Sequence, residues 1–272
     1  MNRPRVIAID WSGRRGAEQR QALWLAEAVD GDLVRLEGGR TRVELVQLLI
    51  ALVDHDPNVI VGLDFAFSLP AWYLRDRGLT AHQLWAALAA ETLTPTMRRL
   101  GLAPWVKAPE RPFWTTGEAH ALLAPEQEFR HTEQDVRVPG SQPKSVFQLV
   151  GGGQVGRGSL YGMQALHQLT AAGFQIWPFD APALPLVVEI FPRVLTGPVR
   201  KNSQRERERY LEAVTMPPEF RGRAATSEDA FDAAISVLVM AARLDELRAL
   251  PDAPDYALEG KIWQPRVPVT FG

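Results

Sequence analysis

Two short apolar runs, each ending in an aspartate, stand out in the pattern of hydrophobic and polar positions. The first covers residues 5–10 and the second residues 59–64. Both are rich in β-branched residues and are bounded by turn-forming residues, which is typical of buried β-strands. Asp10 and Asp64 therefore lie at the carboxyl ends of two predicted strands. Open α/β sheets usually carry their chemistry at that edge.

The pattern between these runs predicts how the chain connects them. Residues 22–29 and 33–36 are typical of strands, with an Asp-Gly-Asp turn between them, and apolar residues at helical spacing predict a helix over about 41–54. The first part of the chain thus has the order β-β-β-α-β. The helix acts as the crossover that returns the fourth strand parallel to the first. Asp10 and Asp64 are then expected to face one another on neighbouring strands.

The rest of the chain adds elements around this unit. Residues from about 70 to 145 alternate helical pieces such as 81–91 with proline- and tryptophan-rich stretches, which indicates an insertion beside the sheet. The elements expected next are a strand or extended loop at 145–150, a helix at about 159–172, strands at 174–177 and 186–191, a charged helix or loop at 200–210, a helix from 226 to about 250, and an edge strand near 261–263. We predict one α/β domain over residues 1–272, with a mixed sheet flanked by helices and a tail at 251–272.

Composition narrows the class of protein. The chain has 272 residues, of which 46% are hydrophobic and 23% charged, as in ordinary globular proteins. A formal net charge of −2 argues against a generally basic protein that coats nucleic acid, and the absence of cysteine excludes disulfides and thiolate zinc sites. No signal peptide or membrane span is evident, so a cytoplasmic protein without a membrane partner is expected.

The late helix contributes two further acids. Asp232 flanks the apolar stripe of that helix, where a carboxylate costs desolvation energy unless something binds it. Asp229 lies one turn earlier, where helix capping and the macrodipole also explain an acid. Glu189 alternates with apolar residues in a predicted strand, where an ion pair with Arg193 fits as well as a catalytic role.

Taken together, these acids resemble the RNase H-like fold, and their order is similar to that of the Holliday-junction resolvase branch. Five short motifs more closely resemble an uncharacterised bacterial family, a domain of unknown function described as predicted RNase H-like nucleases. These motifs are Ile9-Asp10-Trp11-Ser12-Gly13, Gly62-Leu63-Asp64-Phe65-Ala66-Phe67, Phe147-Gln148-Leu149-Val150-Gly151, Val188-Glu189-Ile190-Phe191-Pro192 and Asp229-Ala230-Phe231-Asp232-Ala233. The resemblance implies that fold for most of the chain and a nuclease activity.

The carboxylates themselves point to metal chemistry. No partner cation is evident near them in the sequence, so we expect them to hold one or two Mg²⁺ or Mn²⁺ ions. Asp10 would bridge the ions, Asp64 would bind one, and Asp232, helped by Asp229, would bind the other. Glu189 would be a ligand or would orient the water. Such a site hydrolyses phosphodiesters, so DNA or RNA is the expected substrate.

Several residues are candidates for binding substrate phosphates. They are Ser12, Lys144, Gly152, Gly153, Arg157 and Arg193. A basic cluster follows, made up of Arg193, Arg200, Lys201, Arg205, Arg207 and Arg209. This cluster could track a nucleic-acid backbone, but the glutamates between its members favour a solvated helix face.

Other functions remain open at this stage. Gly151-x-Gly153-x-x-Gly156, followed later by Asp180, has the outline of a dinucleotide-binding fingerprint and would indicate an oxidoreductase. Sugar kinases and actin-like ATPases also place an aspartate and a glycine turn after their first strand, as in Asp10-Trp11-Ser12-Gly13. A non-catalytic binding scaffold that kept the acidic edge is the third alternative.

Overall fold

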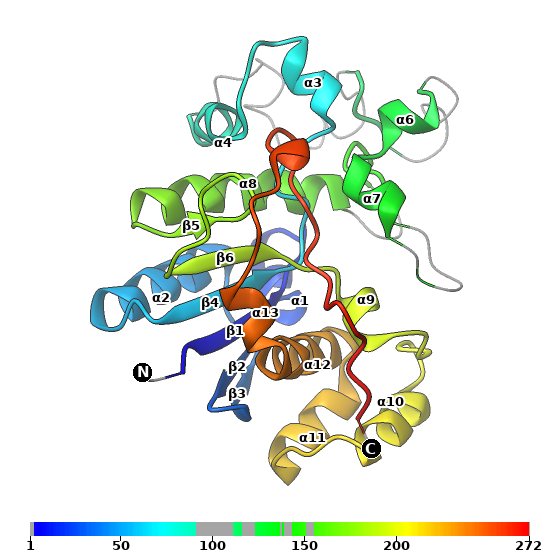
Figure 1. The fold of residues 1–272 in the computed structure, drawn as a ribbon. Coiled ribbons are helices and arrows are strands. Elements are labelled where there is room, and N and C mark those ends of the chain that lie inside the picture. Colours follow the sequence, from blue (N-terminus) through cyan, green and yellow to red (C-terminus); the bar gives the residue numbers. More distant parts are fainter. Residues whose placement is uncertain are drawn as a thin grey trace.

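The centre of the protein is a six-stranded sheet in the order β3-β2-β1-β4-β6-β5 (Figure 1). The computed structural model describes residues 3–90, 111–115, 123–136, 138, 143–150 and 155–271. The strands are β1 (Arg5–Asp10), β2 (Trp24–Val29), β3 (Asp32–Glu37), β4 (Val59–Leu63), β5 (Gln175–Ile176) and β6 (Leu186–Glu189). β1, β2 and β3 pair antiparallel, whereas β4 pairs parallel with β1 and with β6, and β5 pairs parallel with β6. The predicted α/β class, with its antiparallel meander and parallel return, is confirmed. This arrangement is compatible with an RNase H-like sheet.

Helix α2 (Arg42–His55) makes the crossover between β3 and β4. It starts at a capping box: the Thr41 hydroxyl accepts the Glu44 amide at 3.3 Å, and the Glu44 carboxylate accepts the Thr41 amide at 2.7 Å. These bonds satisfy two amides that the first helical turn would otherwise leave unpaired. The start of the crossover is therefore fixed locally, and the chain returns parallel to β1.

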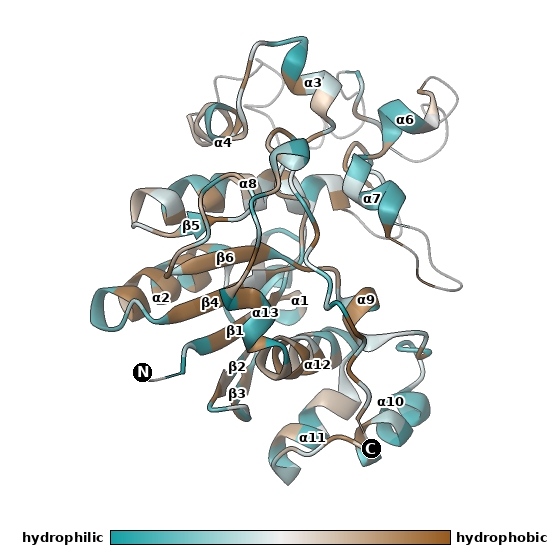
Figure 2. Ribbon diagram, in the orientation of Figure 1, coloured by the Kyte–Doolittle hydropathy of each residue, from teal (hydrophilic) through white to brown (hydrophobic). Residues whose placement is uncertain are grey.

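Successive side chains of each strand point to opposite faces of the sheet, so the hydrophobic core has one part on each face. Ile7, Ile9, Val61 and Leu63 pack in one cluster with α2 and α8 (Val155–Ala171), whereas their neighbours in the strands pack in a second cluster with α12 (Glu228–Ala242). In Figure 2, β4 and β6 are brown along their length, as expected for strands covered on both faces. The sheet is thus the middle layer of three.

The remaining helices lie outside these layers. They are α1 (Gln19–Ala22), α3 (Ala71–Arg75), α4 (Ala81–Ala89), α6 (Pro125–Glu128), α7 (His131–Asp135), α9 (Pro192–Thr196), α10 (Gln204–Glu212), α11 (Pro218–Thr226) and α13 (Leu244–Arg248). Figure 1 shows α3, α4, α6 and α7, which belong to the predicted insertion, on the far side of α8 from the sheet. No described helix combines the length and the apolar composition that crossing a membrane requires.

Four sequence expectations need correction. The helix expected from 226 to 250 is broken, because Arg243 leaves helical geometry at φ −114° and ψ 28° between α12 and α13. Residues 145–150 form a turn, in which the Gln148 amide donates to the Ser145 carbonyl at 3.0 Å, and one bridge, Trp114 to Gln148, in place of the expected strand or extended loop. The tail likewise has one bridge, Ile262 to Glu189, in place of an edge strand. α8 begins at Val155, four residues before the expected start.

Candidate active site

Asp10 and Asp64 lie at the same edge of the sheet, as the sequence predicts. β1 and β4 run parallel with Ile9 opposite Leu63, so each aspartate directly follows the last residue pair between these two strands. The Asp64 amide extends the ladder by donating to the Ile9 carbonyl at 3.1 Å. This bond fixes the two backbones beside one another at the position where both chains leave the sheet.

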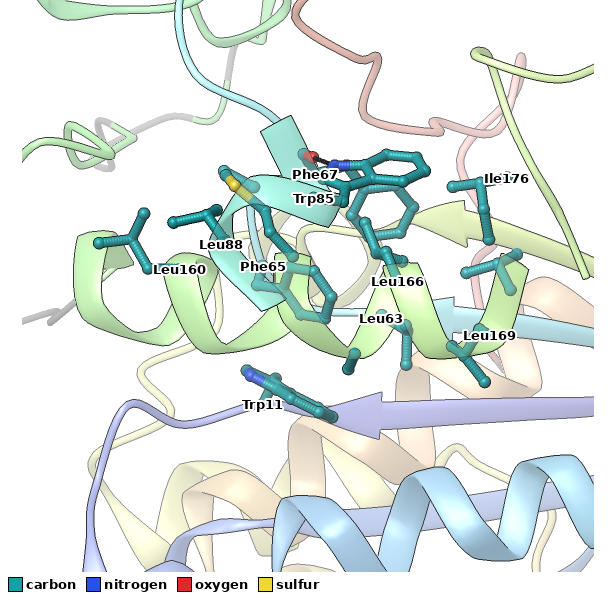
Figure 3. Close-up of a cluster of buried hydrophobic side chains, with 14 of the residues drawn as sticks. Trp11, Leu63, Phe65, Phe67, Trp85, Leu88, Leu160, Leu166, Leu169 and Ile176 are labelled. Carbon is teal, nitrogen blue, oxygen red and sulfur yellow. Dashed lines mark hydrogen bonds between the residues drawn. The ribbon is translucent and has the colours of Figure 1, made fainter. Parts of the chain in front are cut away.

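The aromatic residues after the two aspartates hold this edge in place. Trp11 and Phe65 pack with their ring centroids 5.0 Å apart, beneath α8 (Figure 3). The Trp11 indole nitrogen donates to the Gly158 carbonyl at 3.1 Å. A Cβ atom at Gly162 would lie 2.4 Å from the Phe65 ring, so only glycine lets α8 approach this closely. The turns that carry Asp10 and Asp64 are thereby tied to one helix.

A second close approach joins the turn after β1 to the first turn of α8. A Cβ atom at Gly13 would lie 2.8 Å from the Gly158 nitrogen. Arg42 of α2 holds the same turn from the other side, because its guanidinium donates to the carbonyls of Ser12 and Arg14, both at 2.7 Å. The turn at residues 12–14 is therefore rigidly placed against the amino end of α8.

Helix α12 brings Asp229 and Asp232 to the same edge. The helix is capped by Ser227, whose hydroxyl accepts the Ala230 amide at 3.2 Å. Asp229 lies in the first turn and is half-buried, whereas Asp232 lies one turn later and is 5% exposed. The flank position predicted for Asp232 is in fact inside the core.

The four aspartates act on one another electrostatically. Desolvation by burial raises the pKa of Asp10 well above its usual range, and the charges of Asp64, Asp232 and Asp229 raise it further. Burial likewise raises the pKa of Asp64, with Asp232 as the next cause. The pKa of Asp232 rises to about 6, mainly through burial and against the attraction of Lys201. Such mutual elevation is typical of clustered carboxylates that lack enough positive charge.

Lys201 is a buried cation at this edge whose pairing the sequence did not predict. It is 8% exposed, and its ammonium forms an ion pair with Asp232 Oδ2. The expectations that no cation accompanies the acids and that residues 193–209 form a solvated face are therefore wrong at this position. Arg207 of the same cluster is also buried, and it donates to the Ala225 carbonyl at 2.9 Å. An ammonium 31 positions away in the chain gives no sequence signal of this pairing.

The carboxylate oxygens of the four aspartates suit a hard cation, but the side chains are not arranged around a single ion position. Asp232 Oδ1 is buried and has no hydrogen-bond partner among the described residues, which is costly for a carboxylate oxygen. Oxygen ligands of this kind suit Mg²⁺ and Mn²⁺. Within the described ranges, however, no three His, Asp or Glu side chains are placed to hold one metal ion. The predicted ligand roles of Asp10, Asp64 and Asp232 stay predictions.

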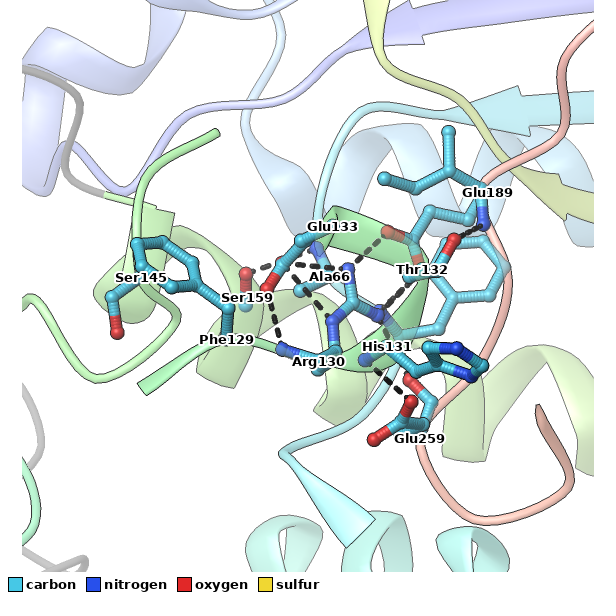
Figure 4. Close-up of polar contacts among 12 residues, drawn as sticks. Ala66, Phe129, Arg130, His131, Thr132, Glu133, Ser145, Ser159, Glu189 and Glu259 are labelled. Atoms are coloured by element: carbon cyan, nitrogen blue, oxygen red, sulfur yellow. Dashed lines mark hydrogen bonds and ion pairs between the residues drawn. The ribbon is translucent and has the colours of Figure 1, made fainter. Parts of the chain in front are cut away.

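Glu189 belongs to a buried ion-pair network (Figure 4). Arg130, 1% exposed, donates to Glu189 Oε1 at 2.5 Å and to Oε2 at 2.8 Å, and to Glu133 Oε1 at 2.9 Å. Glu189 Oε2 also accepts the Phe67 amide at 3.0 Å. Burial disfavours the charged arginine, but the Glu133 and Glu189 carboxylates outweigh this and raise the pKa of Arg130. The partner of Glu189 is therefore Arg130 and not Arg193.

The candidate phosphate-binding residues divide into separate groups. Ser12 and Lys144 line a pocket of about 440 Å³ together with Asp64 and Glu189. Arg157 lies in the first turn of α8, beside this pocket's Gly158. Arg193 lies elsewhere: it lines another cavity, and its guanidinium donates to the Val199 carbonyl at 2.5 Å. Gly152 and Gly153 lie outside the described residues.

Three further arginines, Arg14, Arg15 and Arg42, lie at or against the turn at residues 12–14, near the candidate Arg157. Burial lowers the pKa of Arg157, and the positive charges of Arg15 and Arg14 lower it further. Burial lowers the pKa of Arg42 to about 10, with Arg157 contributing. Like charges crowded in this way favour a bound anion. The acidic edge of the sheet therefore borders a cationic rim formed by Arg14, Arg15, Arg42 and Arg157.

The residues of the dinucleotide fingerprint have other partners. The apolar residues 145–150 contain a turn and one bridge and are not a strand of the sheet, so the strand–helix context that the fingerprint needs is missing from the described residues. Asp180 pairs with His82 at 3.1 Å and accepts the Ile176 amide at 2.8 Å. Neither the absence of a strand in the described residues before the glycines nor the existing partners of Asp180 favours the dinucleotide site.

Comparisons with known proteins do not identify a family for this chain. No protein-family model, no curated protein and no solved structure matches the chain. The resemblance to predicted RNase H-like nucleases therefore stays a prediction from the motifs.

Proposed function

We propose that the protein is a metal-dependent nuclease that hydrolyses phosphodiester bonds in DNA or RNA. The observation that carries this proposal is the meeting of Asp10, Asp64 and Asp232 at one edge of the sheet, each with a raised pKa. Carboxylates from two strands and a helix, held in a rigid and mostly apolar setting, are a costly arrangement for a protein without a cationic ligand.

Each part of the edge has a chemical task in this proposal. Asp10, Asp64 and Asp232, with Asp229 beside them, would hold Mg²⁺ or Mn²⁺. The bound ion would supply an activated water and stabilise the leaving oxygen. The cationic rim, together with Lys144, which lines the same pocket as Arg14, would orient the phosphate and attract the polyanion. Glu189, already bonded to Arg130, would keep the β6 side of the pocket rigid.

The fixed backbone geometry supports this assignment. Hydrolysis needs the attacking and leaving oxygens aligned to within a fraction of an ångström, which rigid elements provide better than loops. Asp10 and Asp64 are held by the sheet ladder and by the Trp11–Phe65 contact. Asp232 is held by a long helix that packs on the same sheet.

A cleavage assay tests the proposal. Single-stranded, duplex and branched DNA and RNA are incubated with the protein in Mg²⁺, Mn²⁺ or EDTA. Wild type is expected to cleave at least one substrate with metal and none in EDTA. Asp64→Asn is expected to lose at least a hundredfold, whereas Asp54→Asn, on the exposed side of α2, keeps full activity. Metal-independent cleavage, or equal activity of the two variants, would overturn the proposal, as would ATP consumption without cleavage.

A further inference from the structure

The backbone of Lys201 is anchored, while its ammonium reaches Asp232 in the acidic edge. It lies between α9 and α10, and its amide donates to the Val199 carbonyl at 3.0 Å. Its own carbonyl accepts from the buried Arg207, which also binds the Ala225 carbonyl at 2.9 Å. The backbone of Lys201 is therefore fixed between α9, α10 and α11, and only its flexible side chain can change position.

The Lys201 charge acts on the whole cluster. It lowers the pKa of Asp10, Asp64, Asp229 and Asp232, opposing the effect of burial at each. Among the ion pairs of the described chain, Lys201–Asp232 is the one that involves any of these four acids. One ammonium thus faces four carboxylates, and it bonds a single oxygen, Asp232 Oδ2. The other oxygen of Asp232 stays buried without a hydrogen-bond partner among the described residues.

This arrangement explains why the cluster is not assembled around a metal. An ammonium and a divalent cation compete for the same carboxylate oxygens, because both are compact positive charges. While Lys201 holds Asp232 Oδ2, that oxygen is not free to bind a metal ion. An isolated buried carboxylate cluster would be strongly destabilising without any cation, so a resident ammonium also serves the fold.

We propose that Lys201 is an exchangeable counter-ion: its ammonium occupies the acidic edge until a divalent cation replaces it at Asp232. The inference rests on the proposed function, because it assumes that the edge binds Mg²⁺ or Mn²⁺. It assigns to Lys201 a positioning role on Asp232 that neither a permanent structural ion pair nor a solvated lysine would have.

Mn²⁺ binding to the full chain, measured by calorimetry without substrate, tests the exchange. Lys201→Met removes the competing charge and is expected to bind Mn²⁺ at least tenfold more tightly than wild type. Arg200→Met, which removes an exposed charge from the neighbouring residue, is the matched control and is expected to bind as wild type does. Thermal unfolding gives a second readout: Mn²⁺ is expected to raise the Tm of Lys201→Met more than that of wild type.

Lys201→Arg keeps the inference testable if the methionine variant does not fold. Arginine keeps the charge and can bond both oxygens of a carboxylate, including Asp232 Oδ1, so it is expected to weaken Mn²⁺ binding several-fold. Equal binding by wild type and both lysine variants would overturn the exchange while leaving the proposed function standing. Binding by Lys201→Met but not by wild type would make Lys201 a permanent counter-ion, which overturns both the exchange and the metal-dependent nuclease. Binding by none of the proteins would also overturn both.

Discussion

Arg130 holds both carboxylate oxygens of Glu189, at 2.5 and 2.8 Å, although 59 residues separate them in the chain. The same guanidinium bonds Glu133 and the carbonyl of Glu259, at 2.9 Å in each case. One arginine therefore joins α7, the end of β6 and the C-terminal tail. Arg130 thereby connects α7 to the edge of the sheet at which Asp10 and Asp64 lie.

Replacing Arg130 by methionine is expected to destabilise the fold by about 3–5 kcal/mol, because it leaves Glu133 and Glu189 buried without their cation. Urea unfolding measures the loss. Arg75→Met, on the exposed side of α3, is the control and is expected to stay within about 0.5 kcal/mol of wild type. A loss below about 1 kcal/mol for Arg130→Met would show that the network contributes little to the fold.

The contact between Gly13 and Gly158 gives a second prediction. Gly13→Ala places a methyl group 2.8 Å from the Gly158 nitrogen, so the turn after β1 and α8 must separate. We expect a loss of about 1–3 kcal/mol in the free energy of unfolding, together with reduced cleavage, because Asp10 precedes this turn. Gly222→Ala, in the open middle of α11, is expected to be neutral or to stabilise by up to about 1 kcal/mol. The same loss for both variants would rule out the close approach as the cause.

The acidic edge predicts how stability changes with pH. The pKa values of Asp10, Asp64 and Asp232 lie above those of an unfolded chain, so the folded state binds protons more tightly. Stability from this source is present at low pH and is lost as pH rises past the pKa of Asp232, about 6. Asp10 lies among Asp64, Asp229 and Asp232, with Lys201 as the opposing charge.

Asp10→Asn removes one of these repelling charges. Without divalent metal, it is expected to be more stable than wild type at pH 7, by an amount of order 1–2 kcal/mol that shrinks towards pH 4. Urea unfolding across this range measures the difference, and Asp54→Asn is expected to show none. A variant less stable than wild type at pH 7 would mean that Asp10 is held by favourable contacts and not repelled.

The cationic rim and Lys144 predict a salt-dependent affinity for nucleic acid. Arg14→Gln and Lys144→Gln are each expected to weaken oligonucleotide binding and to lower the slope of log affinity against log salt by about 1. Fluorescence anisotropy in EDTA measures binding without cleavage. Arg75→Gln is the control, since α3 does not contribute to the pocket lining. Unchanged slopes for both Arg14→Gln and Lys144→Gln would place the nucleic acid elsewhere.

The sheet could be predicted from the sequence because its signals are local. Runs of β-branched residues, an Asp-Gly turn and apolar residues at helical spacing each predict a short segment, and the crossover then determines that Asp10 and Asp64 share an edge. The break of the late helix at Arg243 had no such signal, since the apolar pattern continues through it. Periodicity describes a helix but not where tertiary packing ends it.

The buried ion pairs around the site could not be predicted from the sequence for a related reason. Lys201 lies in a run of arginines and glutamates that looks solvated, and Arg130 lies in a segment without clear periodicity. Their partners, Asp232 and Glu189, are 31 and 59 positions away. Which of many charged residues becomes buried depends on packing between distant elements, and a single sequence carries no record of it.

The central claim is that Asp10, Asp64 and Asp232 share a divalent cation at the edge of the sheet. Crystals of wild-type protein soaked in Mn²⁺, with data collected near the manganese edge, test it most directly. We predict an anomalous difference peak bonded to carboxylate oxygens of Asp10 and Asp64, with Asp232 turned towards it and Lys201 moved away. Saturating Mn²⁺ with no peak at this edge, or with a peak only at another site, would contradict the account.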